Sequence, residues 1–170
     1  MPDPLDIERL YDANAQALFS FLLNLIRNEA DTRDILQEIF VKIAHNPKIL
    51  KGVRNERSYL IRLAHNLAID LIRRRATRVK NHEQIASETI GIFTESQKPD
   101  EAAYRTALEA ALVELPVEQR AVVHLKLWEE LTFDRIAKDL ELSPNTVASR
   151  YRYGLNKLRE LLRPLYEEME

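Results

Sequence analysis

The chain contains no cysteine and only three glycines among its 170 residues. Without cysteine it has no disulfide, no thiolate nucleophile and no cysteine-ligated metal, and scarce glycine is typical of a protein built from long helices. No apolar run approaches the about 18 residues of a membrane span, and the N-terminus, MPDPLDIERL, lacks the basic and then apolar pattern of a signal peptide. We therefore expect a cytoplasmic protein with no segment inserted in a membrane.

Recognisable catalytic motifs are also absent. The four histidines are scattered at His45, His65, His82 and His124. No HExxH, glycine-rich phosphate loop or Ser/His/Asp arrangement accompanies them. Isolated histidines of this kind are most often structural or surface residues. The sequence therefore predicts no catalytic residue, no metal and no cofactor, and we do not expect an enzyme.

The net charge of −2 conceals segments of opposite charge. Residues 54–80 carry eight Lys or Arg against two acidic residues, a net charge of +6. Residues 145–163 carry five Lys or Arg against one acidic residue. Between these basic segments, residues 83–118 carry two Lys or Arg against eight acids, a net of −6. Local basic faces can bind phosphates even when the average charge of the chain is negative.

Apolar residues recur at helical spacing through most of the chain, and no segment carries a convincing strand pattern. The first expected helix spans residues 5–28, and the second runs from a cap at Asp31 or Thr32 to Asn46-Pro47. A loop at 47–57 separates it from the third helix, at residues 58–75. Further helices are expected at residues 101–115, from Pro116 onward, and as a closing pair. In the third helix the expected core face is Leu60, Leu63, Ala64, Leu67 and Leu71. The expected fold is all-α.

Residues 80–100 break the helical pattern. The stretch HEQIASETIGIFTESQKPD has no helical periodicity, is rich in Ser, Thr and Glu, and ends beside Pro99. This composition is typical of a flexible linker. We therefore expect two helical domains, at residues 1–79 and 101–170, joined by a linker at 80–100.

The stretch from Leu131 to Leu161 has the layout of a helix-turn-helix, in which the second helix enters the DNA major groove. Thr132 can cap the first helix, and Ser143 with Pro144 can start the second. The turn holds Glu141 where glycine is common, so a non-glycine residue in a left-handed or strained conformation is expected there. The second helix has an apolar stripe at Val147, Tyr151, Gly154, Leu155, Leu158, Leu161 and Leu162 and a polar face at Asn145, Ser149, Arg152 and Asn156, with Tyr153 beside it.

Two other helices carry polar faces. Tyr59, Arg62, Asn66 and Arg73 lie within roughly 60° of each other around one helix axis. An aromatic ring, two guanidinium groups and an amide in one line suit single-stranded DNA, because rings stack on bases and arginines hold phosphates. Asp34, Gln37 and Glu38 share an exposed face at i, i+3, i+4 spacing. Taken alone, that face is most simply a solvated surface.

Three segments together resemble bacterial sigma factors. DTRDILQEIFVKI is similar to the DxxDLxQEVF segment of region 2, and SYLIRLAHNLAIDLIRRR is similar to the WLYRIARNxxxDxxR segment that follows it. The stretch from LPVEQR to LREL resembles region 4, with its LPxxQR opening and TVxSR. Nothing corresponds to regions 1.1 or 3. The chain thus resembles the extracytoplasmic-function (ECF) group of the sigma-70 family.

The resemblance implies that two helical domains dock on RNA polymerase core and read two promoter elements to start transcription. For the −10 element it implies Tyr59, Arg62, Asn66 and Arg73, beside a specificity loop at residues 51–56, with Asn66 helping to capture a flipped base. For the −35 element it implies Asn145, Thr146, Ser149, Arg150, Arg152 and Tyr153. This chain departs from the family pattern at three positions. Tyr59 stands where the family usually has tryptophan, His65 stands where arginine is common, and Ala148 stands where lysine or arginine is usual.

The implied partners are the β′ and β subunits of the polymerase core, promoter DNA and an anti-sigma factor. In the family, the face that holds Asp34, Gln37 and Glu38 meets a coiled coil of β′. Two alternatives stay open. A sigma-like decoy for an anti-sigma factor should lose the basic and aromatic readers that this chain keeps. A stand-alone helix-turn-helix regulator accounts for residues 116–165 but leaves QEIF and AHNLAID unexplained.

Overall fold

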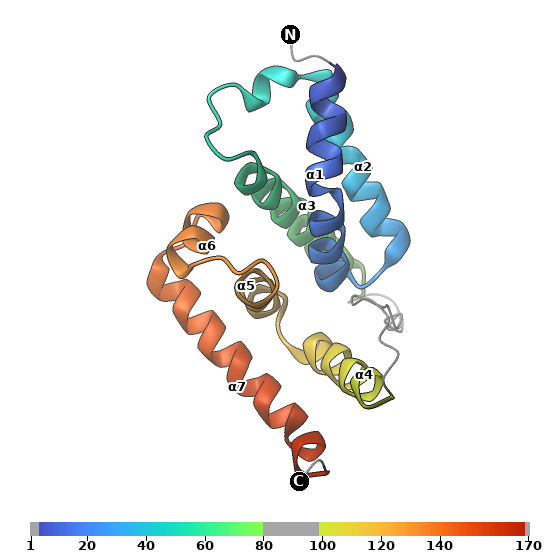
Figure 1. Cartoon of the computed structure of the whole chain (residues 1–170), viewed down its shortest axis with the longest axis vertical. Coiled ribbons are helices and arrows are strands. Elements are labelled where there is room, and N and C mark those ends of the chain that lie inside the picture. The colour runs from blue at the N-terminus through green and yellow to red at the C-terminus, as the bar shows by residue number, and fades with distance from the viewer. Residues whose placement is uncertain (1–3, 80–98, 169–170) are drawn as a thin grey trace. The chain divides into compact units, whose positions relative to one another are not determined.

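A computed structural model describes residues 4–79 and 99–168, and in these ranges it holds seven α-helices, one short 3-10 helix and no strand (Figure 1). The expected all-α fold is therefore confirmed. The chain divides into two compact helical units, Met1–Glu88 and Thr89–Glu170. The expected linker at 80–100 lies outside the described residues, apart from Pro99 and Asp100, which begin a helix.

The first unit is a three-helix assembly with one 3-10 turn. Its elements are α1 (Pro4–Ile26), α2 (Glu29–His45), η1 (Pro47–Leu50) and α3 (Glu56–Val79), and α1 packs against both α2 and α3 (Figure 1). The core is formed mainly by Leu18, Phe21, Leu22 and Leu25 of α1, Ile35, Leu36, Ile39, Phe40 and Ile43 of α2, and Leu60, Ala64 and Ala68 of α3. Burial of each large apolar side chain contributes about 1.5–3 kcal/mol.

The buried face of α3 differs from the expected one. Leu63, Leu67 and Leu71 are only half-buried, so assigning them to the core was wrong. Ile61 and Ile69 are buried instead, which rotates the buried stripe around the helix axis. The segment carries more apolar residues than one stripe needs, and packing against α1 and α2 selects among them.

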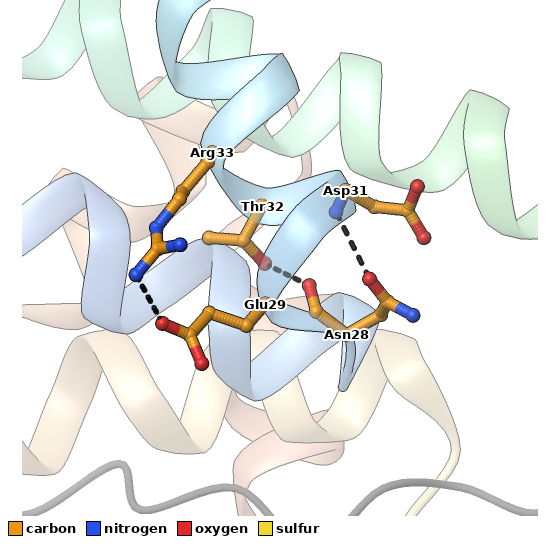
Figure 2. Close-up of polar contacts among 5 residues, drawn as sticks. All are labelled: Asn28, Glu29, Asp31, Thr32 and Arg33. Atoms are coloured by element: carbon orange, nitrogen blue, oxygen red, sulfur yellow. Dashed lines mark hydrogen bonds and ion pairs between the residues drawn. The ribbon is translucent and has the colours of Figure 1, made fainter.

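The start of α2 also differs from the expected one, because neither Asp31 nor Thr32 is the cap. The helix begins at Glu29, and Asn28 caps it by accepting a hydrogen bond from the Asp31 N–H at 2.9 Å (Figure 2). The hydroxyl of Thr32 donates to the Asn28 carbonyl oxygen at 2.8 Å. Arg27, with φ of 61°, turns the chain after α1, and this left-handed residue delivers Asn28 to the capping position.

The second unit contains α4 (Pro99–Glu114), α5 (Val117–Leu127), α6 (Phe133–Leu140) and α7 (Pro144–Glu168), and α7 packs against the other three. Its main cluster is Ala111, Leu112, Leu115, Val123, Leu158 and Leu162. Most of the expected stripe of α7 is buried or half-buried, but Leu161 is 42% exposed and does not belong to the core. Within residues 4–79 and 99–168, no helix combines the length and apolar character that a membrane span requires.

The arginine of LPVEQR has a structural task in this unit. Arg120 is buried, and its Nη1 donates hydrogen bonds to the carbonyl oxygens of Leu112 at 3.2 Å and Val113 at 3.3 Å. These carbonyls lie in the last turn of α4, where helix carbonyls lose their i+4 partners, and that of Leu112 also accepts a hydrogen bond from the Leu115 N–H at 3.2 Å. Arg120 therefore ties the start of α5 to the end of α4.

Candidate nucleic-acid interfaces and docking face

The helix-turn-helix is built from the local contacts that the sequence indicates. The Oγ1 of Thr132 accepts a hydrogen bond from the Arg135 N–H at 3.1 Å, and Ser143 Oγ accepts one from the Thr146 N–H at 3.2 Å. Glu141 ends α6 in the left-handed region, at φ 57° and ψ 46°. The predicted caps, the three-residue turn and the left-handed Glu141 are therefore confirmed.

The angle between α6 and α7 is held by a contact that the sequence pattern did not reveal. The rings of Phe133 and Tyr151 meet edge to face with their centroids 5.4 Å apart, and the Nζ of Lys126 lies 4.7 Å from the Phe133 centroid. Such aromatic pairs contribute about 0.5–1.5 kcal/mol beyond the burial of their area. Tyr151 therefore orients the presented face of α7, which the stripe pattern alone does not indicate.

The polar face of α7 is open to solvent. Asn145, Arg152 and Tyr153 are exposed, while the other expected −35 residues, Thr146, Ser149 and Arg150, are half-buried. The guanidinium carbon of Arg152 lies 5.3 Å from the centroid of the Tyr153 ring, which is 59% exposed. This cation–π contact restricts the Arg152 side chain before any partner arrives.

None of the expected −10 residues is buried in the core. Tyr59 and Arg62 are half-buried, whereas Asn66 and Arg73 are exposed on the same helix, α3. The amide oxygen of Asn66 lies 3.4 Å from Nδ1 of His65. A ring, two guanidinium groups and an amide therefore lie along one side of α3, outside the core.

The first turn of α3 is held by contacts on both sides. Asn55 caps it, because its Oδ1 accepts a hydrogen bond from the Ser58 N–H at 3.0 Å. Arg57 reaches α1, where its Nε donates to Asn14 Oδ1 at 3.0 Å and its Nη2 to the Ala13 carbonyl at 2.9 Å. Sequence reasoning missed this link because 43 residues separate its two side chains.

The basic end of α3 is tied to α2. Arg75 forms an ion pair with Asp31, one of the two residues that the sequence pattern predicts as the cap of α2. The two side chains are 42% and 25% exposed. Part of the positive charge in residues 54–80 is thereby neutralised within the domain, while Arg73 and Arg74 stay exposed.

The expected docking face of α2 is exposed at Asp34, Gln37 and Glu38. Beside it lies an open groove of about 540 Å³ lined by Tyr11, Phe19, Arg33, Leu36, Gln37, Phe40, Val41 and Ala44. From the sequence we expected Tyr11 to lie on the inward face of α1, but it is 46% exposed and packs edge-on against Phe40, with the two ring centroids 4.9 Å apart. The face therefore combines acidic side chains with an apolar groove.

Both halves of the chain match known families. Residues 10–78 match sigma-70 region 2, and residues 105–158 match sigma-70 region 4. The chain is 31% identical over 160 residues to the ECF RNA polymerase sigma factor SigL of Mycobacterium tuberculosis, an alignment that covers 92% of this chain and 88% of SigL. The chain belongs to the ECF group of RNA polymerase sigma factors. An ECF sigma factor directs promoter recognition and transcription initiation.

Other comparisons agree with this membership. SigX of Bacillus subtilis, an ECF RNA polymerase sigma factor, is 28% identical over 165 residues, covering 94% of this chain and 85% of SigX. The sigma factor RpoE of Bartonella quintana, solved in complex with the anti-sigma factor NepR, superimposes with a TM-score of 0.78 over 93% of this chain and 97% of RpoE. At 20% identity, that likeness shows the fold.

Proposed function

We propose that this ECF sigma factor docks on RNA polymerase core through α2, reads unpaired −10 bases with α3 and reads the −35 duplex with α7. The observation that carries the proposal is the presence of three chemically different polar faces on these three helices. Each face lies on a helix whose apolar side packs in a core, so each is held in place without its partner. The proposed domains are residues 1–79 and 101–170.

The −35 assignment rests on the helix-turn-helix. The exposed Arg152 can bond O6 and N7 of guanine in the major groove, a contact that discriminates between bases. Asn145, near the start of α7, is well placed for a neighbouring base or phosphate, and Arg150 supplies a second cation. We assign Thr146, Ser149 and Tyr153 to the same face.

The −10 assignment rests on the line along α3. Extruding a base from the duplex costs a few kcal/mol, so the surface that receives it must already be formed. Tyr59 is assigned to stack on an unpaired base, Asn66 to hydrogen-bond a base edge, and Arg62 and Arg73 to hold phosphates.

Polymerase docking is assigned to Asp34, Gln37 and Glu38. Their acidic face and the adjoining groove suit a partner helix that presents basic and apolar side chains. We propose that the β′ subunit of polymerase supplies this helix, and that region 4 contacts the β subunit.

Regulation is proposed to come from a separate protein. RpoE of Bartonella quintana was solved with an anti-sigma factor bound, and we propose that an anti-sigma factor controls this chain in the same way. We further propose that the protein acts in the cytoplasm and has no catalytic activity of its own.

Run-off transcription with purified core polymerase on a promoter library tests the proposal. The expected result is a set of transcripts that requires both this protein and paired −10 and −35 elements. Core binding without any promoter-specific transcript would favour a decoy for an anti-sigma factor. Promoter binding in the absence of polymerase, with no effect on transcription, would favour a stand-alone helix-turn-helix regulator.

A further inference from the structure

The link between Arg57 and Asn14 joins the first turn of α3 to the middle of α1. Arg57 lies two residues before Tyr59 and donates through two nitrogens, Nε to Asn14 Oδ1 and Nη2 to the Ala13 carbonyl. Two parallel contacts from one planar guanidinium restrict both the distance and the angle between the elements they join. The link therefore constrains the start of α3 more tightly than a single flexible contact would.

Asn14 is an acceptor whose orientation is already set. Its side chain is buried at 6% exposure, and its Nδ2 donates a hydrogen bond to the Leu10 carbonyl at 2.9 Å. Since the amide nitrogen is engaged inside α1, the amide oxygen is held toward Arg57. The geometry of the link thus originates in the rigid core helix.

Apolar packing does not fill the junction that the link spans. A cavity of about 400 Å³ lies between α1 and the segment before α3, and its lining includes Arg9, Ala13 and Asn14 of α1 together with Pro47 and Leu50. The segment also contains Gly52, whose φ of 85° is readily available only to glycine. Polar contacts at the end of this segment therefore have to supply positional restraint that close packing supplies elsewhere in the domain.

We propose that Arg57 and Asn14 are a positioning pair that fixes residues 51–56 and the first turn of α3, and thereby the surface that receives unpaired −10 bases. The inference rests on the proposed −10 function of α3. Neither residue is assigned a contact with DNA. Because the Arg57 side chain is exposed, its replacement removes no apolar core packing, whereas a displacement of about 1 Å in a preformed site can slow a reaction by about 100-fold.

The test is the kinetics of promoter opening by holoenzyme assembled from each variant, followed by permanganate reactivity of unpaired thymines. Arg57→Ala is expected to slow the opening step about tenfold or more. The core-binding constant and the constant for initial duplex binding should stay within about twofold of the wild type, since neither uses this surface. A purely structural role would instead lower the opening rate, the core-binding constant and the duplex-binding constant in parallel, because it would reduce the folded fraction of the protein.

Partner variants make the test specific to the pair. Asn14→Leu should slow opening, but no more than Arg57→Ala, because it leaves the hydrogen bond from Arg57 to the Ala13 carbonyl in place. The double variant should be no slower than Arg57→Ala. Arg57→Lys keeps the charge but not the planar pair of donors, so an intermediate rate is expected. Arg9→Ala removes a cation from the same cavity wall and leaves the pair intact; it should open at the wild-type rate.

Asn66→Ala separates this inference from the proposed function. Normal opening by Arg57→Ala together with slow opening by Asn66→Ala would overturn the positioning role and leave the −10 assignment standing. Normal opening by both variants would overturn the −10 assignment and the positioning role with it. If Arg57→Ala fails to fold, then wild-type opening rates for Arg57→Lys and Asn14→Leu would overturn the inference.

Discussion

Gly154 of α7 lies so close to Val123 of α5 that a Cβ at position 154 would stand 2.9 Å from Cγ2 of Val123. The same Cβ would come within 3.3 Å of Leu115 Cδ2. All three residues are buried, so neither helix can move away without opening the core of the second unit. The absence of a side chain at Gly154 therefore sets how closely α7, the helix proposed to read the −35 element, approaches α5.

Gly154→Ala should destabilise the second unit. Overpacking costs about 1–3 kcal/mol, and the better helix propensity of alanine returns about 1 kcal/mol, so a net loss of up to about 2 kcal/mol is expected by urea denaturation. Adding Val123→Ala should cost less in this background than in the wild type, because it makes room for the new methyl group. A rise in stability for Gly154→Ala alone would contradict the close contact.

His124 should make folding depend on pH. Burial lowers its pKa from 6.5 to about 4, so the folded state holds the neutral form and resists protonation. The neutral His124 contributes fully to the free energy of unfolding above about pH 6.5, and this contribution is lost as the pH falls toward 4. The total loss is about 3 kcal/mol. His124→Phe should flatten the stability profile over this range, as measured by urea denaturation at a series of pH values. Equal slopes for wild type and His124→Phe would disprove the assignment.

Arg152→Ala should weaken binding to −35 duplex DNA by about 1–3 kcal/mol and relax the base preference at one position. Arg159, exposed two turns further along α7, provides the matched control. Arg159→Ala should change affinity less and leave the sequence preference intact, because it removes charge without removing a base contact. Binding to a panel of single-base variants of the element measures both effects. Equal preference profiles for Arg152→Ala and the wild type would remove Arg152 from the base-reading set.

Asn66→Ala should act at a later stage. A flipped base exists only after the duplex opens, so this variant should bind duplex promoter normally and form open complexes poorly. Permanganate footprinting of unpaired thymines in the holoenzyme complex shows the difference. If Asn66→Ala opens the promoter normally while Arg152→Ala abolishes duplex binding, the −10 assignment fails and the protein is better described as a helix-turn-helix regulator.

Reversing charge at Asp34 and Glu38 should abolish binding to core polymerase. Both side chains are exposed, so the helical circular-dichroism signal should not change. Asp12→Lys, a reversal at an exposed position of α1, is the control and should bind core polymerase normally. Undiminished binding by the double reversal would remove the docking assignment from this face.

The sequence by itself determined the helix-turn-helix, because the chemistry of that motif is local. The caps at Thr132 and Ser143 and the left-handed Glu141 each depend on groups a few residues apart, and all were confirmed. The exposed face of α2 that holds Asp34, Gln37 and Glu38 was also correct, because i, i+3, i+4 spacing is a local property of a helix. The family itself was recognisable from motifs of this local kind.

Tertiary structure decided what local pattern leaves open. The cap of α2 moved to Asn28 because Arg27 turns the chain in the left-handed region, which its side chain does not predict. The buried face of α3 depended on which of several apolar residues met α1 and α2. The ion pair of Asp31 with Arg75, across 44 residues, arises only when α2 and α3 pack together. Contacts at that separation depend on how whole helices meet, whereas caps and turns depend on hydrogen bonds within about four residues of the chain.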